Sequence, residues 1–320
     1  MTTVGQRDAL IDKVQLNVDP VITSLVTGTP RRRTMPGMRL LRPITVDTVN
    51  FQYVTFDNAH LQDVDAERAM RAEITSIDWD ATTATGKLKR YSKKVTKDKD
   101  EIRNAHPSLR IQELSALMAR RTVELSMEKV IRDVVTDSTP GNSYASGHIF
   151  ALTNGFDDPV NGDSKTAIRT AGATIAADTG AQIGELSVFL PEASFNAAVD
   201  DPLFLEKRGN FSTVLPTAAD LAAYWGVKEV WTANPVQKSG TGITPMYSDI
   251  AVVYFDGVGM DFDTEYGELV WGVSFKLNGG VALEAWYDNK TTSWNFPWED
   301  WLLPKITNPK AAALLTNCKD

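Results

Sequence analysis

The longest regular pattern of apolar and polar positions predicts a helix over residues 108–135. Pro107 and Ser108 provide a start signal, and apolar residues then recur at spacings of about three and four. These residues are Leu109, Ile111, Leu114, Leu117, Met118, Val123, Leu125, Val130, Ile131, Val134 and Val135. At 1.5 Å per residue, the helix would be roughly 42 Å long. It is therefore much longer than the helix of an average globular domain.

Residues 57–104, which precede this helix, are charged and contain few apolar side chains to bury. Alternating positions predict strands over residues 71–79 and 87–96, and the small residues at 81–86 predict a turn between them. An isolated hairpin of two strands is only marginally stable in water. We therefore expect residues 57–104 to leave their own subunit and lie across a neighbouring one.

The rest of the chain predicts a body that mixes helices and strands, and hence an α+β fold. A loop rich in Gly, Asn and Ser at residues 142–162 separates the long helix from this body. Amphipathic patterns predict helices at residues 164–179, 192–199 and 218–225. Strands are predicted at residues 42–46, 50–56, 185–190, 227–233, 250–255, 269–277 and 281–287.

Composition excludes several classes of protein. The 320 residues are 42% hydrophobic and 23% charged, as in a globular protein with a sizeable core. The net charge of -8 argues against a nucleic-acid-binding molecule. Cys318 is the only cysteine, so no intrachain disulfide can form and nothing indicates secretion. No apolar signal segment or membrane span is found in the sequence, so we expect a cytosolic protein with no membrane partner.

Charge is unevenly distributed along the chain. Residues 241–320 contain five basic and eleven acidic side chains, whereas residues 86–104 contain three acidic side chains and eight basic ones, which are Lys87, Lys89, Arg90, Lys93, Lys94, Lys97, Lys99 and Arg103. Either these are two solvated faces, or the basic arm docks on an acidic surface of an adjacent copy. Arg31, Arg32 and Arg33 form a second basic group, which suits either an interfacial loop or a phosphate.

The sequence contains no convincing catalytic constellation, and we predict no catalytic residue, cofactor or metal. His60, His106 and His148 lie in unrelated segments and are expected in solvated or capping positions. Three carboxylates, on Asp261, Asp263 and Glu265, suit an acidic surface loop better than a calcium loop. The tryptophans at 294, 298 and 301 could stack on sugars, but their density beside prolines favours packing of a terminal segment onto the body.

The order of elements resembles the tailed-bacteriophage major capsid protein family, over residues 57–287. A basic arm leads through Ala105-His-Pro into the long helix, which contains Glu124-Leu-Ser-Met-Glu128-Lys-Val-Ile. The later motifs are Asp158-Pro, Glu185-Leu-Ser-Val-Phe-Leu-Pro and Leu221-Ala-Ala-Tyr-Trp-Gly-Val-Lys-Glu-Val-Trp. The fold of this family is shared with the herpesvirus capsid floor domain and with encapsulins.

The resemblance implies a division of the chain. Residues 1–56 would form an N-terminal arm and the first strands, and residues 57–104 an extended β-hairpin loop. Residues 105–216 would form a peripheral domain around a spine helix at 108–135, residues 217–288 an axial domain with a mixed sheet, and residues 289–320 a segment that packs back on the peripheral domain. Candidates for a loop at the capsomer axis are Asp256, Asp261, Asp263, Glu265 and Glu268.

The function that the resemblance implies is structural. Copies of the chain would form hexamers and pentamers of an icosahedral head shell, assembled in the host bacterial cytoplasm around double-stranded DNA without sequence-specific contacts. A separate scaffolding protein would be a further partner, because few residues precede the arm. A portal would be another, and a decoration protein is an open alternative. The alternatives are an encapsulin-type compartment shell and, from another class, a carbohydrate-active hydrolase.

Overall fold

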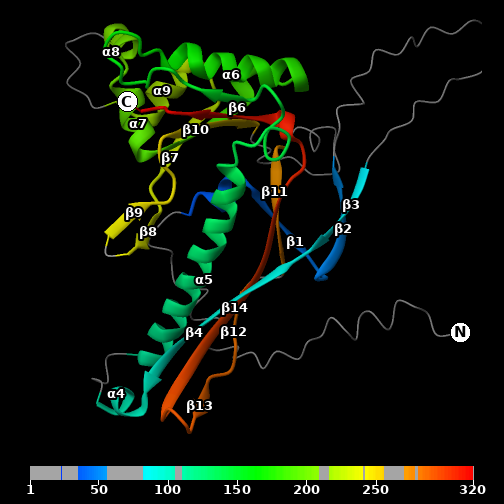
Figure 1. Ribbon diagram of the computed structural model, residues 1–320, viewed down its shortest axis with the longest axis vertical. Helices are drawn as coiled ribbons and strands as arrows, with labels where there is room; N and C mark the ends of the chain where they lie inside the picture. The colour runs from blue at the N-terminus through cyan, green and yellow to red at the C-terminus, as the bar shows by residue number, and fades with distance from the viewer. Residues whose placement is uncertain are drawn as a thin grey trace, which may run out of the picture.

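The computed structural model describes residues 23, 35–55, 82–104, 110–208, 216–240, 242–255, 270–277 and 280–319. These residues form two large sheets and two sheets of two strands each (Figure 1). The helices are α3 (Gly37–Leu40), α4 (Lys99–Asn104), α5 (Ile111–Val135), α6 (Ser164–Thr179), α7 (Glu192–Val199), α8 (Pro202–Arg208) and α9 (Ala218–Trp225), with short 3-10 turns at Ile183–Glu185 and Pro309–Ala311. The strands are β1 (Arg42–Val46), β2 (Asn50–Thr55), β3 (Thr82–Lys87), β4 (Lys89–Asp98), β5 (Ile149–Ala151), β6 (Leu186–Pro191), β7 (Glu229–Ala233), β8 (Val236–Ser239), β9 (Gly242–Pro245), β10 (Ile250–Phe255), β11 (Gly272–Leu277), β12 (Val281–Ala282), β13 (Trp286–Asp288), β14 (Ser293–Ile306) and β15 (Ala312–Thr316).

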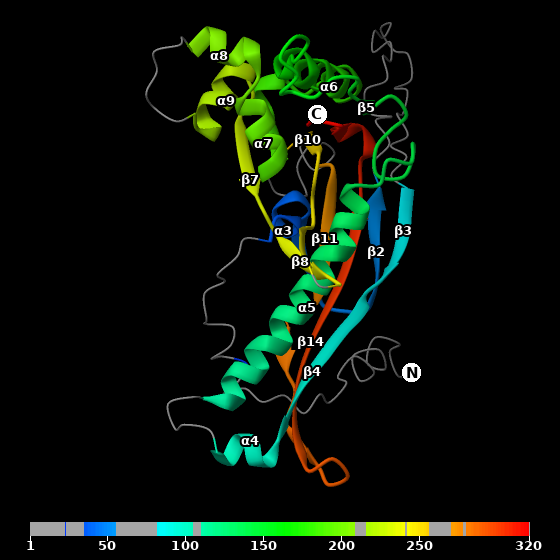
Figure 2. The same ribbon diagram turned by 60° about the vertical axis from the view of Figure 1, so that its left-hand side comes forward.

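The six-stranded sheet is built around β14. Strand β4 pairs with β14 in antiparallel register from Asp98↔Ser293 to Lys89↔Leu302. Strands β11, β12 and β13 follow one another along β14, and β1 adds to β11 in parallel. Helix α5 runs beside β4 and β14 in both views (Figures 1 and 2). We call α5 and this sheet the limb.

A stripe of small and medium apolar side chains buries α5 against the limb sheet. Its members, spaced by three or four residues, are Ala116, Ala119, Val123, Met127, Ile131 and Val135. They share one core with Trp298 and Leu302 of β14. Leu114 and Met118, which the sequence pattern placed in the same stripe, are instead 46% and 57% exposed. The alanines explain the difference, because they let the helix approach the bulky side chains of β14 on that face.

The five-stranded sheet, in the order β5-β15-β10-β6-β7, forms the upper layer together with α6, α7, α8 and α9. Strands β6 and β10 are buried at every position, as is usual for strands covered on both faces. Alternate side chains point to opposite faces. Val188 packs with Ile168 and Ile175 of α6, whereas Phe189 joins the core that contains Val135 of α5. The sheet is therefore buried between its own helices and the limb.

Local signals set several helix ends where the sequence predicts them. Helix α6 begins at Asp163, whose side chain accepts a hydrogen bond from Thr166 N at 2.8 Å, and ends at Gly180 with φ 74°. Helix α9 begins with a capping box between Thr217 and Asp220. The predicted bounds of α6, α7 and α9 are confirmed, as is the predicted end of α5 at Val135.

The predicted hairpin of the basic arm is wrong in its pairing. Residues 82–87, most of which were predicted as a turn, form β3 and pair with β2. Strand β4 pairs with β14 of its own chain, so residues 89–98 are part of the sheet of their own subunit and do not leave it. The other predicted strand, residues 71–79, lies outside the described residues.

Packing explains why small residues form a strand here. A Cβ atom on Gly86 would lie 2.7 Å from Cζ of Phe51, so this position of β3 must stay small for the Phe51 ring to pack. Leu88 follows and is buried in a third apolar cluster with Phe275 and Trp301. The β2–β3 pair thus covers the face of the sheet that carries Trp301, and α5 covers the face that carries Trp298.

The last part of the chain enters both sheets. Strand β14 lies along α5, whereas β15 is an inner strand of the upper layer. The expected boundary at residue 217 also falls within the upper layer, since Trp225 Nε1 of α9 donates to Ser164 Oγ of α6 at 3.0 Å. The elements are grouped into the limb and the upper layer by pairing between strands that are distant in the sequence. Local sequence patterns do not reveal such pairing. Helix α8, strand β5 and the β8–β9 hairpin were not predicted either.

A buried carboxylate joins three segments where the limb meets the upper layer. Glu128 of α5 is buried, and its Oε1 accepts hydrogen bonds from Gly37 N at 2.9 Å and from the Tyr247 hydroxyl at 2.8 Å. Burial and the neighbouring Glu128 carboxylate hold the pKa of Tyr247 well above its usual value, so the hydroxyl stays protonated as a donor. Glu128 thereby ties α3 and the segment before β10 to α5.

Replacing Glu128 with alanine should lower the free energy of unfolding by about 3 kcal/mol, because two buried donors lose their acceptor and a cavity opens. Equilibrium unfolding in urea measures this change. Glu113→Ala removes a more exposed carboxylate of the same helix and should change the free energy of unfolding by less than about 0.5 kcal/mol. Equal losses in the two variants would contradict the role of Glu128.

The capping box of α9 predicts a pH dependence. Hydrogen bonds from the Thr217 backbone and side chain hold the pKa of Asp220 below its usual value. Its stabilising contribution is therefore present above the unfolded pKa of about 3.9 and is lost as the pH falls through the folded pKa. Asp220→Asn should lower the melting temperature at pH 7, and the difference from wild type should shrink as the pH falls below about 4. A difference that does not change with pH would contradict this assignment.

Candidate assembly surface

The basic side chains of β4 are partly held by β13 and β14 of the same chain. The Arg90 guanidinium lies 5.9 Å from the centroid of the Trp301 ring and forms an ion pair with Glu299. Lys94 Nζ lies 5.3 Å from the centroid of the Trp286 ring, a distance at which a cation is attracted to the ring face. Arg90 thus pairs with an acid of its own chain, and its contact with a neighbour stays a prediction. Glu299 is a buried carboxylate of its own chain, and an unpaired buried charge is costly.

The remaining predicted contact residues of this segment lie at the surface. Lys97 Nζ pairs with Glu101 at 3.0 Å within the same segment. The other predicted residues, Lys87, Lys89, Lys93, Lys99 and Arg103, are exposed on β3, β4 and α4. They form a basic surface along the limb, so a contact with another copy through these side chains stays a prediction.

Two groups of predicted residues lie outside the described residues. They are the basic group Arg31, Arg32 and Arg33, and the axis candidates Asp256, Asp261, Asp263, Glu265 and Glu268. The acidic segment is bounded by buried residues of two different layers, since Phe255 ends β10 of the upper layer and Val270 joins the core of the limb. Residues 256–269 therefore connect the two sheets.

Leu114 and Met118 add an apolar patch that the sequence pattern did not identify as surface. They lie four residues apart on α5, so they share one face of the helix, and both are largely exposed. Charged pairs flank them: Arg110 with Glu113, and Arg120 with Glu124 at 2.9 Å. An exposed apolar patch with a polar rim is typical of a protein–protein contact. The sequence offered one indication that some of these side chains are exposed: the helix has more apolar residues than one of its faces can bury.

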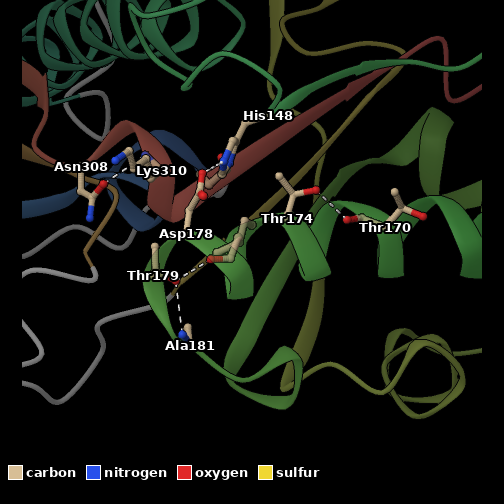
Figure 3. Close-up of polar contacts among 10 residues, drawn as sticks. His148, Thr170, Thr174, Asp178, Thr179, Ala181, Asn308 and Lys310 are labelled. Atoms are coloured by element: carbon tan, nitrogen blue, oxygen red, sulfur yellow. Dashed lines mark hydrogen bonds and ion pairs between the residues drawn. The ribbon is translucent and has the colours of Figure 1, made fainter. Parts of the chain in front are cut away.

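His148 is buried, contrary to the expected solvated or capping position. Its Nδ1 lies 2.9 Å from the Ala312 carbonyl oxygen and its Nε2 lies 2.8 Å from Asp178 Oδ2. Figure 3 shows the imidazole between β15 and the end of α6. Both ring nitrogens therefore have polar partners, one on β15 and one on α6. His148 therefore fastens α6 to the centre of the upper layer. His60 and His106 lie outside the described residues.

His148→Ala should lower the free energy of unfolding by about 3 kcal/mol, since a buried side chain and two hydrogen bonds are lost. Asp178→Asn serves as the matched variant. Its amide oxygen still accepts from Nε2, so the expected loss is only about 1 kcal/mol. Urea unfolding of both variants at pH 7 measures these values. A His148→Ala variant as stable as wild type would show that these contacts do not hold the layer.

Within the described ranges, the chemistry of an active site was not found. No group of three or more His, Cys, Asp or Glu there is placed to hold a metal ion. Trp298 and Trp301 are buried in the limb, which confirms the prediction that they pack the terminal segment, and Trp294 is partly exposed. No helix in this part of the chain is long and apolar enough to cross a membrane.

Comparison with known proteins shows the fold. No protein-family model and no curated protein sequence matches the chain. Among solved structures, a phage-related protein from Bordetella bronchiseptica RB50 superposes with a TM-score of 0.71 at 18% identity, over 95% of this chain and 98% of that one. A capsid structure of the cyanophage P-SCSP1u gives 0.58 at 10% identity, over 90% and 89% of the two chains.

The SrpI encapsulin of Synechococcus elongatus PCC 7942 is also similar, with a TM-score of 0.53 at 12% identity over 90% of this chain and 89% of that one. The chain therefore has the α+β fold of tailed-phage capsid proteins that the sequence resemblance predicted. This fold forms the shells of both phages and encapsulins.

Proposed function

We propose that this chain is the major capsid protein of a tailed bacteriophage, and that its copies form the hexamers and pentamers of an icosahedral head shell around double-stranded DNA. The observation that carries the proposal is the likeness to phage proteins over nearly the whole length of both chains, including the limb and the upper layer. In this role the chain is a structural protein and not an enzyme. It assembles in the host bacterial cytoplasm and ends in the virion.

The limb and the upper layer suit the two domains of such a subunit. We assign the limb, with α5 as its spine, to the peripheral domain, and the upper layer to the axial domain. The extended loop is assigned to β2, β3 and residues 56–81, in place of residues 57–104. The register supports this shift, because β2 and β3 are paired as far as Thr55 and Thr82, the residues on either side of 56–81.

Contacts between copies are proposed at surfaces that the described part of the chain leaves exposed. One is the apolar patch of Leu114 and Met118, and another is the basic surface that includes Lys89 and Lys93. A closed shell repeats each contact by rotation, so one patch on every copy is used many times. The basic surface would meet acidic side chains of a neighbour, which a chain of net charge -8 offers in excess.

The partners follow from the same role. A separate scaffolding protein, a portal and a decoration protein are proposed partners, and the acidic residues 256–268 remain our candidates for the capsomer axis. Packaged DNA would be confined without base-specific contacts. A negative net charge suits this arrangement, because strong attraction to phosphate would hinder packaging and release.

Expression of the chain together with its scaffolding protein should give closed shells in negative-stain electron micrographs. The double variant Leu114→Ser/Met118→Ser should reduce shell yield roughly tenfold while the subunit stays folded, since exposed side chains contribute little to stability. The conservative control Leu114→Ile/Met118→Leu should assemble like wild type. Monomers of the wild-type chain under all conditions would overturn the proposal.

An encapsulin-type compartment is the second candidate, favoured by the shared fold. The contents of the purified shells separate the two roles. Nuclease-resistant double-stranded DNA of uniform length supports a phage head, whereas an enclosed enzyme without DNA supports a compartment. The hydrolase alternative lacks support in the described residues, because Trp298 and Trp301 are buried and cannot stack on a sugar.

A further inference from the structure

A surface cavity of about 460 Å³ lies on the upper layer, where α6 begins beside α8 and α9. These three helices lie together in both views (Figures 1 and 2). Lys165 of α6, Lys207 of α8 and Tyr224 of α9 line the cavity, with the apolar side chain of Leu203 at its edge. The cavity belongs to neither the basic surface of the limb nor the apolar patch of α5.

Two positive charges meet inside this cavity. Lys165 Nζ lies 5.0 Å and Lys207 Nζ lies 5.3 Å from the centroid of the same Tyr224 ring, so both ammonium groups gather at one ring. This proximity lowers the pKa of Lys165, and Arg169 lowers it further. Like charges repel at such a distance unless an anion lies between them.

The carboxylates near Lys165 and Lys207 do not cancel the repulsion between the two lysine charges. Asp163 accepts a hydrogen bond from Thr166 N as the cap of α6, and its opposing effect is the weakest of the influences on the pKa of Lys165. Glu206 also lines the cavity and is exposed on α8. The lysine pair is thus the positively charged feature of a cavity whose acids are at the cap or at the exposed edge.

Tyr224 supplies a firm floor with a polar end. Its ring packs against Phe204 at a centroid distance of 5.2 Å, which joins α9 to α8. Desolvation by burial, with smaller contributions from Asp201 and Asp163, raises the pKa of Tyr224 to about 12. Its hydroxyl therefore keeps its proton at neutral pH and can donate a hydrogen bond. The ring face attracts the two lysine ammonium groups and holds them beside each other. Two ammonium groups and a hydroxyl donor suit an oxyanion.

We infer that the cavity is an oxyanion-binding site, in which Lys165 and Lys207, held against the ring of Tyr224, clamp one phosphate or carboxylate group with their ammonium groups. The group could be a free inorganic oxyanion or the carboxylate of a side chain from an adjacent copy. The second source rests on the proposed function. It fits a cavity much larger than a single anion and edged by Leu203, which is 41% exposed.

Isothermal titration calorimetry of unassembled subunits with inorganic phosphate at constant ionic strength tests the site. Wild type should bind phosphate, and Lys165→Gln and Lys207→Gln should each weaken binding roughly tenfold, since one charge-assisted contact is lost. Lys228→Gln is the matched control, an exposed lysine of the same layer that does not line the cavity, and should bind like wild type. Circular dichroism checks that all variants fold.

Shell assembly of the same variants identifies the source of the group. If both cavity variants lose phosphate binding and also assemble poorly, the carboxylate of an adjacent copy occupies the site in the shell. If they lose phosphate binding but assemble normally, the ligand is a free oxyanion. Wild-type subunits that do not bind phosphate, or a Lys228→Gln variant that loses binding as the cavity variants do, would overturn the site. The phosphate titrations use unassembled subunits. Failure of the wild-type chain to form shells would therefore count against the proposed function and not against the phosphate site.

Discussion

The antiparallel ladder between β4 and β14 is the interaction on which the limb depends. A strand rich in lysine has little apolar surface of its own, and it is stable here because β14 offers aromatic rings and a buried carboxylate in register with it. Arg90 meets Trp301 and Glu299 of that strand, while Tyr91 and Val95 pack towards the core of α5. Without the ladder, α5 would lose part of the surface that buries its apolar stripe.

The upper layer depends on the limb in turn, because its sheet is buried on both faces. Its own helices cover one face, and the core shared with α5 covers the other. Glu128 lies at this shared core and accepts hydrogen bonds from α3 and from Tyr247. These hydrogen bonds join the segments within otherwise apolar surroundings. The two layers therefore behave as one packed unit, and a change at their junction should affect both.

Sequence reasoning succeeded where structure is set by neighbouring residues and failed where it is set by distant ones. The ends of α6 follow from Asp163 and Gly180, and those of α9 from Thr217 and Gly226, all of which are local signals. The pairing of β4 with β14 depends on residues about two hundred positions away, which no local pattern encodes. The overall capsid fold was nevertheless predicted, because the order of elements and short motifs resembled a known family.

The candidate surfaces show the same limit. The basic side chains of segment 86–104 were identified from composition alone. Composition does not show that Arg90 pairs within its own chain while Lys89 and Lys93 are exposed. That distinction requires the register between β4 and β14. Leu114 and Met118 were assigned to the core because periodicity alone does not say which of two adjacent helix faces is buried. The lysine pair in the upper layer joins α6 and α8, and only the tertiary packing of these helices brings it together.

The positions of β14 and β15 along the chain have a consequence for synthesis on the ribosome. Both strands are inner members of their sheets, yet they follow all their partner strands in the sequence. The ion pair of Arg90 cannot form until Glu299, 209 positions later, has been synthesised. Contacts of such long range make folding slow. The limb sheet cannot close until residue 306 has left the exit tunnel, and the upper sheet cannot close until residue 316 has done so. Nascent chains on one messenger are therefore kept from associating through native surfaces, which arise only when both sheets are complete.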